Sequence, residues 1–109
     1  MGGAATLAAE MIRHIVMWKL KGPSAEEKRQ QAEQARAALL GMRGLVPGMT
    51  EIEVGIGSVS GEQEADLVLS STHDSWQALA DYQDHPAHAP VKQLIGGLRT
   101  ERRVVDFEL

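Results

Sequence analysis

Hydrophobic and polar residues alternate along residues 11–21, which read MIRHIVMWKLK. The segment is rich in β-branched and aromatic residues and contains no proline, so it predicts a strand. One face would carry Ile12, His14, Val16, Trp18 and Leu20, and the other Arg13, Ile15, Met17 and Lys19. Because both faces are partly apolar, we expect both to be covered.

A helix is predicted between Ser24 and Gly44. Ser24 and Glu27 have the spacing of a capping box, and the residues that follow are strong helix formers. The apolar positions lie close to one stripe of the helix and are mostly small: Ala32, Ala35, Leu39 and Met42. The segment therefore predicts an amphipathic helix whose largely alanine stripe would leave room beside the sheet.

Two more strands are predicted over residues 48–58 and 65–72, separated by the polar turn SGEQE. A helix beginning at Asp74 or Ser75 should end near His85, because a residue that precedes proline is disfavoured in helical geometry. A short helical piece over about residues 90–98 and a last strand over residues 101–109 follow.

This order of elements predicts an α+β, ferredoxin-like β-α-β-β-α-β fold. Its four-stranded sheet is antiparallel and carries helices on one face only. Ile15, Met17 and Val68 would then lie on the open face, which makes that face apolar. An open apolar face on a small protein indicates a partner, and the simplest partner is a second copy. We therefore expect a homodimer that forms through the open sheet face.

Composition restricts the class of protein. The chain has 109 residues, a net charge of −4 and no cysteine, which indicates one domain without a disulfide or cysteine-based zinc site. No basic surface for nucleic acid is expected, and no apolar run reaches the roughly 18 residues of a membrane span. The first ten residues lack the pattern of a signal peptide, so we expect a flexible extension over residues 1–10, a domain over residues 11–109 and a cytoplasmic location.

The segment DYQDHPAH, residues 81–88, contains the only tyrosine and two of the four histidines. Pro86 forces the chain to turn, so the helix must stop near His85. The turn would bring His88 over the same side of the sheet as His14, with Tyr82 one helical turn earlier. Three polar groups that converge on an apolar cleft are typical of a small-molecule site.

Three stretches, RHIVMWKLK, DYQDHPAH and VVDFEL, resemble the stress-responsive dimeric α/β-barrel (Dabb) family. The resemblance covers residues 11–109 and implies a ferredoxin-like homodimer whose two sheets pack into a barrel. One branch of the family is a plant polyketide cyclase that performs an intramolecular aldol condensation without a metal or organic cofactor. In that branch the residue at the position that matches His88 is the general base, and the residue at the position that matches Tyr82 assists it. The residues of the cyclase branch at the positions that match His14 and Asp106 also lie at the pocket.

These roles agree with the chemistry of the side chains. Histidine titrates near neutral pH and is suited to removing a proton beside a carbonyl, while a tyrosine hydroxyl holds the substrate oxygen. Asp106 would fix the tautomer of His14 if the first and last strands are neighbours. Trp18 departs from the cyclase branch, which has a smaller aliphatic residue there, and its ring would reduce the cavity.

Structural roles explain the same residues. His85 and His88 form a possible metal pair without a third ligand, and Tyr82 could cover the core with its hydroxyl in water. A buried His14 could be satisfied by Asp106 alone. We interpret Trp18 and Trp76 as core residues, and His73 as a solvated residue at the junction of a strand and a helix.

Two classes of function remain open at this point. The first is a homodimeric stress-response protein that binds a small, largely apolar ligand between sheet and helices without a cofactor or metal. Its ligand-binding residues would be His14, Val16, Trp18, Leu67, Leu69 and Asp106. The second is a cofactor-independent cyclase or lyase that uses His88 as general base and Tyr82 as its assistant. A cofactor-free monooxygenase is a weaker alternative.

Overall fold

A computed structural model describes residues 10–58 and 63–109. The predicted N-terminal extension therefore lies outside the described residues up to residue 9, and so does most of the predicted SGEQE turn. The described residues form seven elements in this order: β1 (Ile12–Leu20), α2 (Ala25–Leu40), β2 (Met49–Ile56), β3 (Leu67–His73), α3 (Trp76–Asp84), α4 (His88–Leu98) and β4 (Arg99–Glu108). This order confirms the predicted ferredoxin-like plan.

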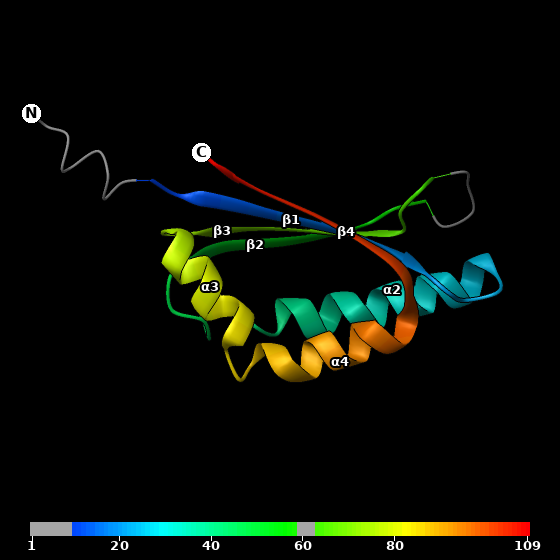
Figure 1. Ribbon diagram of the computed structural model, residues 1–109. Helices are drawn as coiled ribbons and strands as arrows, with labels where there is room; N and C mark the ends of the chain where they lie inside the picture. Colours follow the sequence, from blue (N-terminus) through cyan, green and yellow to red (C-terminus); the bar gives the residue numbers. More distant parts are fainter. Residues whose placement is uncertain (1–9, 59–62) are drawn as a thin grey trace, which may run out of the picture.

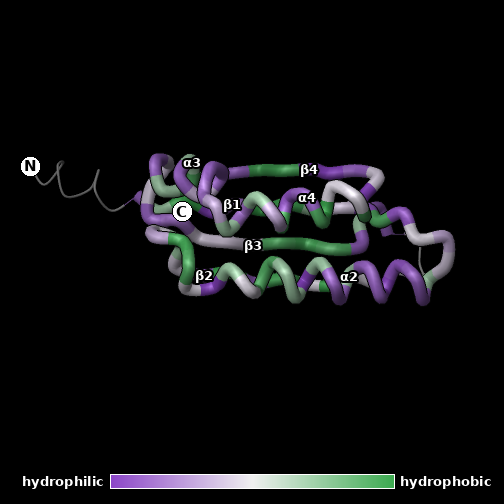
Figure 2. Tube along the Cα trace, turned by 90° about the horizontal axis from the view of Figure 1, so that it is seen from below, coloured by the Kyte–Doolittle hydropathy of each residue, from purple (hydrophilic) through white to green (hydrophobic). Residues whose placement is uncertain are grey.

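The sheet has the strand order β2-β3-β1-β4, and every neighbouring pair in it is antiparallel. All the described helices lie on one side of it (Figure 1). Seen from the helix side, α2 runs over β2 and α4 over β1, β3 lies between the two helices, and β4 forms an edge (Figure 2). No element within the described residues covers the other face of the sheet.

The core lies between the sheet and the helices. The side of β1 that was predicted to be buried is buried throughout, with Ile12 0% and Trp18 5% exposed. The predicted stripe of the first helix is confirmed as well, since Ala32, Ala35, Leu39 and Met42 are all buried. The small side chains in this stripe leave little bulk between α2 and the sheet, so the two layers pack closely.

Local signals set the helix ends. The Ser24 hydroxyl accepts a hydrogen bond from the Glu27 amide, which begins α2 as predicted. This helix ends at Leu40, four residues earlier than Gly44. The Ser75 hydroxyl accepts from the Ala78 amide and begins α3. The helix α4 begins at His88, two residues earlier than predicted, so His88 belongs to its first turn.

Two predicted environments are wrong. His73 is fully buried, because β3 extends one residue further than predicted and directs this side chain toward the helices. It pairs with Ile12 of β1 and Met49 of β2. Trp76 is 50% exposed, because the buried stripe of α3 runs through Leu79 and Tyr82, to the side of the tryptophan.

Two glycines before β2 offer a test of how tightly α3 is held. Gly44 and Gly48 both have positive φ, of 80° and 84°. A Cβ at Gly44 would meet nothing within 4 Å, whereas a Cβ at Gly48 would lie 2.7 Å from the Cβ of Ala78 in α3. Gly44→Ala should lower the free energy of unfolding by about 1 kcal/mol through backbone strain alone. Gly48→Ala should lower it by about 2–4 kcal/mol, because overpacking adds to the strain. Urea denaturation of both variants checks this, and equal losses would contradict the close contact.

Candidate functional site

A cavity of about 260 Å³ lies between the helix-covered side of the sheet and α4. Strands, helices and their ends all contribute to its wall. Its lining residues are His14, Val16, Trp18, Leu39, Leu69, Tyr82, Gln83, His88, Val91, Lys92, Ile95, Gly96, Arg99 and Arg102. The deep part is apolar and aromatic, and the charged residues belong to α4 and β4.

Four buried rings form a cluster around Tyr82. The rings of Tyr82 and His88 stack with centroids 4.2 Å apart. His73 lies 5.0 Å from Tyr82, and His14 lies 5.8 Å from it in an edge arrangement. Tyr82 and His73 are fully buried, and His88 is 9% exposed. His88 is therefore part of the cavity wall. It does not lie at the rim, which is where sequence reasoning had placed it.

The expected pair of His14 and Asp106 is present. The two residues are opposite each other on β1 and β4, and the His14 Nδ1–H donates to Asp106 Oδ1 at 2.5 Å. A carboxylate accepts only, so the ring proton of neutral His14 resides on Nδ1 and the lone pair on Nε2. The role of this pair toward a ligand remains a prediction.

Three polar atoms of the ring cluster are buried without a hydrogen-bond partner among the described residues: Tyr82 Oη, His88 Nδ1 and His73 Nδ1. Each unpaired buried group costs about 1–3 kcal/mol. The Nε2 atom of His73 is paired with the Ser71 hydroxyl at 2.9 Å. Tyr82 and His88 line the cavity with other atoms of their rings, because these polar atoms are themselves fully buried.

Burial keeps His73, His88 and Tyr82 uncharged at neutral pH. It lowers the pKa of His88 to about 4, and the nearby Lys92 charge acts in the same direction. It also lowers the pKa of His73 to about 4, with a further contribution from His14. The same effect raises the pKa of the Tyr82 hydroxyl to about 12. Tyr82 and His88 are therefore neutral polar residues in the wall of the cavity.

The structure gathers most of the predicted site residues around one space. His14, Val16, Trp18, Leu69, Tyr82 and His88 all line the cavity. Two predicted residues do not line the cavity. Leu67 is buried in the core, and Asp106 binds His14 from the neighbouring strand. Trp18 forms part of the wall and leaves the cavity open.

Among the titratable residues of this region, sequence reasoning missed four, namely His73, Lys92, Arg99 and Arg102. Extending the alternation of Leu67, Leu69 and Ser71 by one step would have placed His73 on the helix-covered side.

His85 has a local role. Its Nδ1 accepts a hydrogen bond from the Ala87 amide at 3.0 Å, within the turn between α3 and α4. No three His, Cys, Asp or Glu residues in the described ranges are grouped so that they could hold a metal ion. Among the helices that the structure describes, none is both long and apolar enough to cross a membrane.

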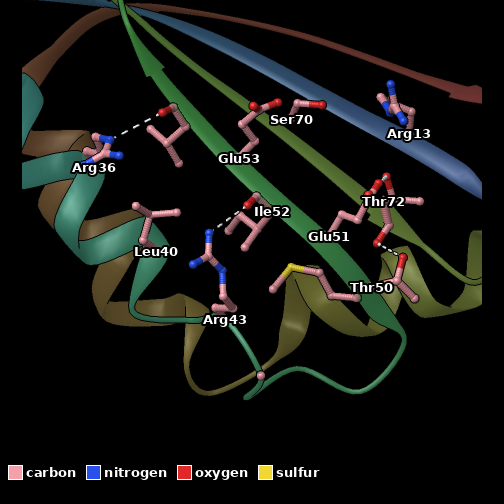
Figure 3. A pocket seen from close by; sticks show the side chains of 13 residues that line it. Arg13, Arg36, Leu40, Arg43, Thr50, Glu51, Ile52, Glu53, Ser70 and Thr72 are labelled. Carbon is pink, nitrogen blue, oxygen red and sulfur yellow. Dashed lines mark hydrogen bonds between the residues drawn. The ribbon is translucent and has the colours of Figure 1, made fainter.

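A larger hollow of about 860 Å³ follows the edge of β2 (Figure 3). Two of the arginines that line it are engaged with the protein. Arg36 and Arg43 of α2 donate to the carbonyl oxygens of Val54 and Ile52 at 3.4 and 3.2 Å. These arginines cover the hydrogen-bonding groups of an edge strand, which discourages pairing with another chain. The larger hollow lies at the edge of the sheet, whereas the smaller cavity lies against the core and gathers six of the predicted site residues, so it is the better candidate for a ligand.

Comparison with known proteins agrees with this arrangement. The family model described as Stress responsive A/B Barrel Domain (Dabb) matches residues 12–109. The chain belongs to the Dabb family. No curated protein matches the sequence.

Solved structures resemble this Dabb domain over nearly its full length. A protein from Bacteroides fragilis, described as dimeric, ferredoxin-like and of unknown function, is 27% identical with a TM-score of 0.80. The similarity covers 91% of this chain and 96% of that one. A dimeric ferredoxin-like protein from Thermobifida fusca, also of unknown function, is 24% identical with a TM-score of 0.79, covering 93% and 92%. A hydroxynitrile lyase from Passiflora edulis shares the fold at 18% identity and a TM-score of 0.75, covering 93% and 94%.

The lowered histidine pKa values predict an acid-sensitive fold. Unfolded histidine titrates near 6.5, whereas folded His73 and His88 titrate near 4. Between these values the unfolded chain holds more protons, so the free energy of unfolding should fall as the pH is lowered from about 6.5. Each histidine contributes up to one proton to this slope. Urea denaturation between pH 7 and pH 5 should show a flatter slope in His73→Gln and in His88→Gln. His85→Gln, outside the ring cluster, is the control, and a slope that none of the variants alters would contradict the assignment.

Proposed function

We propose that this Dabb-family protein binds a small, largely apolar molecule in the cavity between β1 and α4. The observation that carries the proposal is an open space of about 260 Å³ in the core of a small domain. Protein interiors are normally packed with few voids larger than a water molecule. An apolar cavity of about 150 Å³ is enough for benzene. This space therefore suits one substituted ring or a short chain with a polar end.

The lining supports the same interpretation. Val16, Leu39, Leu69, Val91 and Ile95 supply apolar contact. Tyr82 and His88 add two polar rings to this lining, and each carries a buried polar atom without a hydrogen-bond partner among the described residues. An apolar pocket with a few convergent polar groups is the usual form of a small-molecule site.

Two adjacent glycines in α4 provide a matched test. Gly96 lines the cavity and Gly97 does not, and a Cβ at either would meet nothing within 4 Å. Gly96→Leu should obstruct the cavity and weaken binding of a single-ring probe, 4-methylbenzamide, about tenfold or more. Gly97→Leu should leave binding unchanged, and both variants should gain similar helix stability. Isothermal titration calorimetry measures the affinity. Equal binding by the two variants would show that the probe binds elsewhere, and failure of the unchanged protein to bind it would count against the proposed function.

We also propose that the protein is a homodimer that buries the open face of the sheet. This face carries an apolar group that includes Ile15, Met17, Val68, Val105 and Phe107. Met17, Val105 and Phe107 are 40%, 51% and 41% exposed in a single copy. Exposed apolar patches of this kind mark interaction surfaces. The dimeric Bacteroides fragilis relative supports a second copy as the partner.

A charge on the open face should separate the two copies. Val105→Glu places a carboxylate where the partner sheet would pack, and burying an unpaired charge is costly. Leu45→Glu makes the same change at a residue that is 58% exposed and lies outside the sheet. Sedimentation velocity at micromolar concentration should show a dimer for the unchanged protein and for Leu45→Glu, and a monomer for Val105→Glu. A dimeric Val105→Glu would place the interface elsewhere.

A second candidate function is proton transfer beside a carbonyl group, as in a cyclase or lyase without a cofactor. The hydrogen bond from His14 to Asp106 favours it, because it leaves His14 Nε2 as a proton acceptor. His88 was predicted to be the base, but its pKa near 4 makes it a weak acceptor at neutral pH. We infer that His14 would take the proton if this chemistry occurs. Ligand binding stands first, since it requires only the cavity.

A further inference from the structure

Three cationic side chains belong to the lining of the cavity: Lys92 of α4, and Arg99 and Arg102 of β4. All three residues are exposed, so they mark the side on which the cavity opens to solvent. No aspartate or glutamate is among the residues that line the cavity. The opening is therefore positively charged, although the whole chain carries a net charge of −4.

These cations lack carboxylate partners in the described part of the chain. The ion pairs found there are His14 with Asp106 and Arg103 with Glu101. The Lys92 ammonium donates to the Gln83 carbonyl at 2.5 Å, which holds it beside the end of α3. A carbonyl acceptor does not neutralise the charge. Lys92, Arg99 and Arg102 thus remain available to an external anion.

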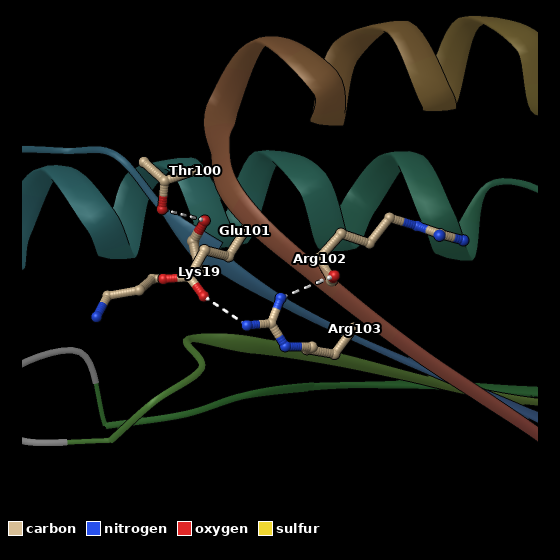
Figure 4. A network of polar contacts seen from close by, with 5 residues as sticks. All are labelled: Lys19, Thr100, Glu101, Arg102 and Arg103. Carbon is tan, nitrogen blue, oxygen red and sulfur yellow. Dashed lines mark hydrogen bonds and ion pairs between the residues drawn. The ribbon is translucent and has the colours of Figure 1, made fainter.

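The position of Arg102 follows from the register of β4. Arg102 is opposite Trp18, whose side chain faces the helices, and so it belongs to the same side of the sheet. Arg102 and Arg103 leave β4 in opposite directions (Figure 4). Arg103 pairs with Glu101 at 3.2 Å, away from the cavity. Two adjacent arginines therefore have different surroundings.

The positive charge reaches the polar groups inside the cavity. Burial is the main influence on the Tyr82 pKa, and the Arg102 charge acts against it by favouring the ionised hydroxyl. Burial also dominates the pKa of His88, and Lys92 lowers it further. The Asp106 carboxylate on the same strand as Arg102 is engaged by His14. A negative group near the opening would meet an attractive potential.

We propose that the natural ligand is a small apolar carboxylate, with its body in the cavity and its carboxylate among Lys92, Arg99 and Arg102. Arginine binds a planar carboxylate through two parallel hydrogen bonds, and charge-assisted bonds are about twice as strong as neutral ones. The apolar wall determines the size of the body, and the three cations determine the charge of the head group. This inference rests on the proposed ligand-binding function and adds the chemical class of the ligand.

An isosteric pair of probes tests the inference. The probes 4-methylbenzoate and 4-methylbenzamide have the same shape and differ in charge. We expect the benzoate to bind about tenfold more tightly at low salt, measured by calorimetry. Raising the ionic strength should weaken binding of the benzoate and leave that of the benzamide unchanged.

Variants of the two neighbouring arginines test whether the preference for the benzoate arises from the cations at the opening of the cavity. Arg102→Gln should reduce affinity for the benzoate about fivefold or more and leave affinity for the benzamide within twofold. Arg103→Gln removes the same charge from the same strand on the other side, and should change neither. Equal binding of the two probes by the unchanged protein would overturn the carboxylate inference but not the proposal that the cavity binds a ligand. An equal loss in both arginine variants would overturn it as well. Absence of binding by either probe would overturn the proposed function itself.

Discussion

The cavity depends on the break between α3 and α4. His85 adopts extended backbone geometry before Pro86, with φ −67° and ψ 138°, and its ring accepts a hydrogen bond from the Ala87 amide. The His88 amide donates to the His85 carbonyl, which closes the turn. This turn separates Tyr82, in the last part of one helix, from His88, in the first turn of the next. A continuous helix would not stack these rings face to face 4.2 Å apart.

The break also explains why a polar cluster exists inside a small core. Once α3 and α4 diverge, the rings of His73, Tyr82 and His88 occupy the space that packed aliphatic side chains would fill in a core built only for stability. The unpaired atoms in this cluster cost free energy that a protein interior normally avoids. Departures of this kind from otherwise consistent packing are expected at functional sites. The closely packed layer of α2 on the sheet provides stability on the other side of the same core.

The parts of the fold set by local rules were predictable from the sequence. The alternation along β1 placed His14 and Trp18 on the buried face, and Pro86 determined the end of α3. The pairing of His14 with Asp106 was predicted from the family resemblance, on the condition that the first and last strands are neighbours. Features that depend on how far an element extends were not predictable in the same way. His73 became buried through one additional residue of β3, and His88 joined the wall because α4 begins earlier.

The register of β4 set a further limit on prediction. From the sequence, Arg102 and Arg103 are two adjacent charges near the end of the chain. Only the pairing with β1 determines that Arg102 is opposite Trp18 and faces the helices. Every residue of β4 is exposed, because an edge strand is accessible on both faces. Exposure therefore does not distinguish Arg102 from Arg103. Sequence reasoning therefore recovered the apolar and aromatic wall of the site but not its charged opening.

The contrast between a negative chain and a positive opening has a consequence for recognition. A net charge of −4 does not attract anions from a distance, and salt screens such fields over about 8–10 Å. The three cations at the cavity would therefore act only on an anion that is already close to them. An ion without an apolar body would gain little from the cavity wall, and an apolar molecule without a charge would gain nothing from Arg102. The site would therefore select a molecule that has both an apolar body and a negative charge, because unpaired cations lie at the opening of an apolar cavity.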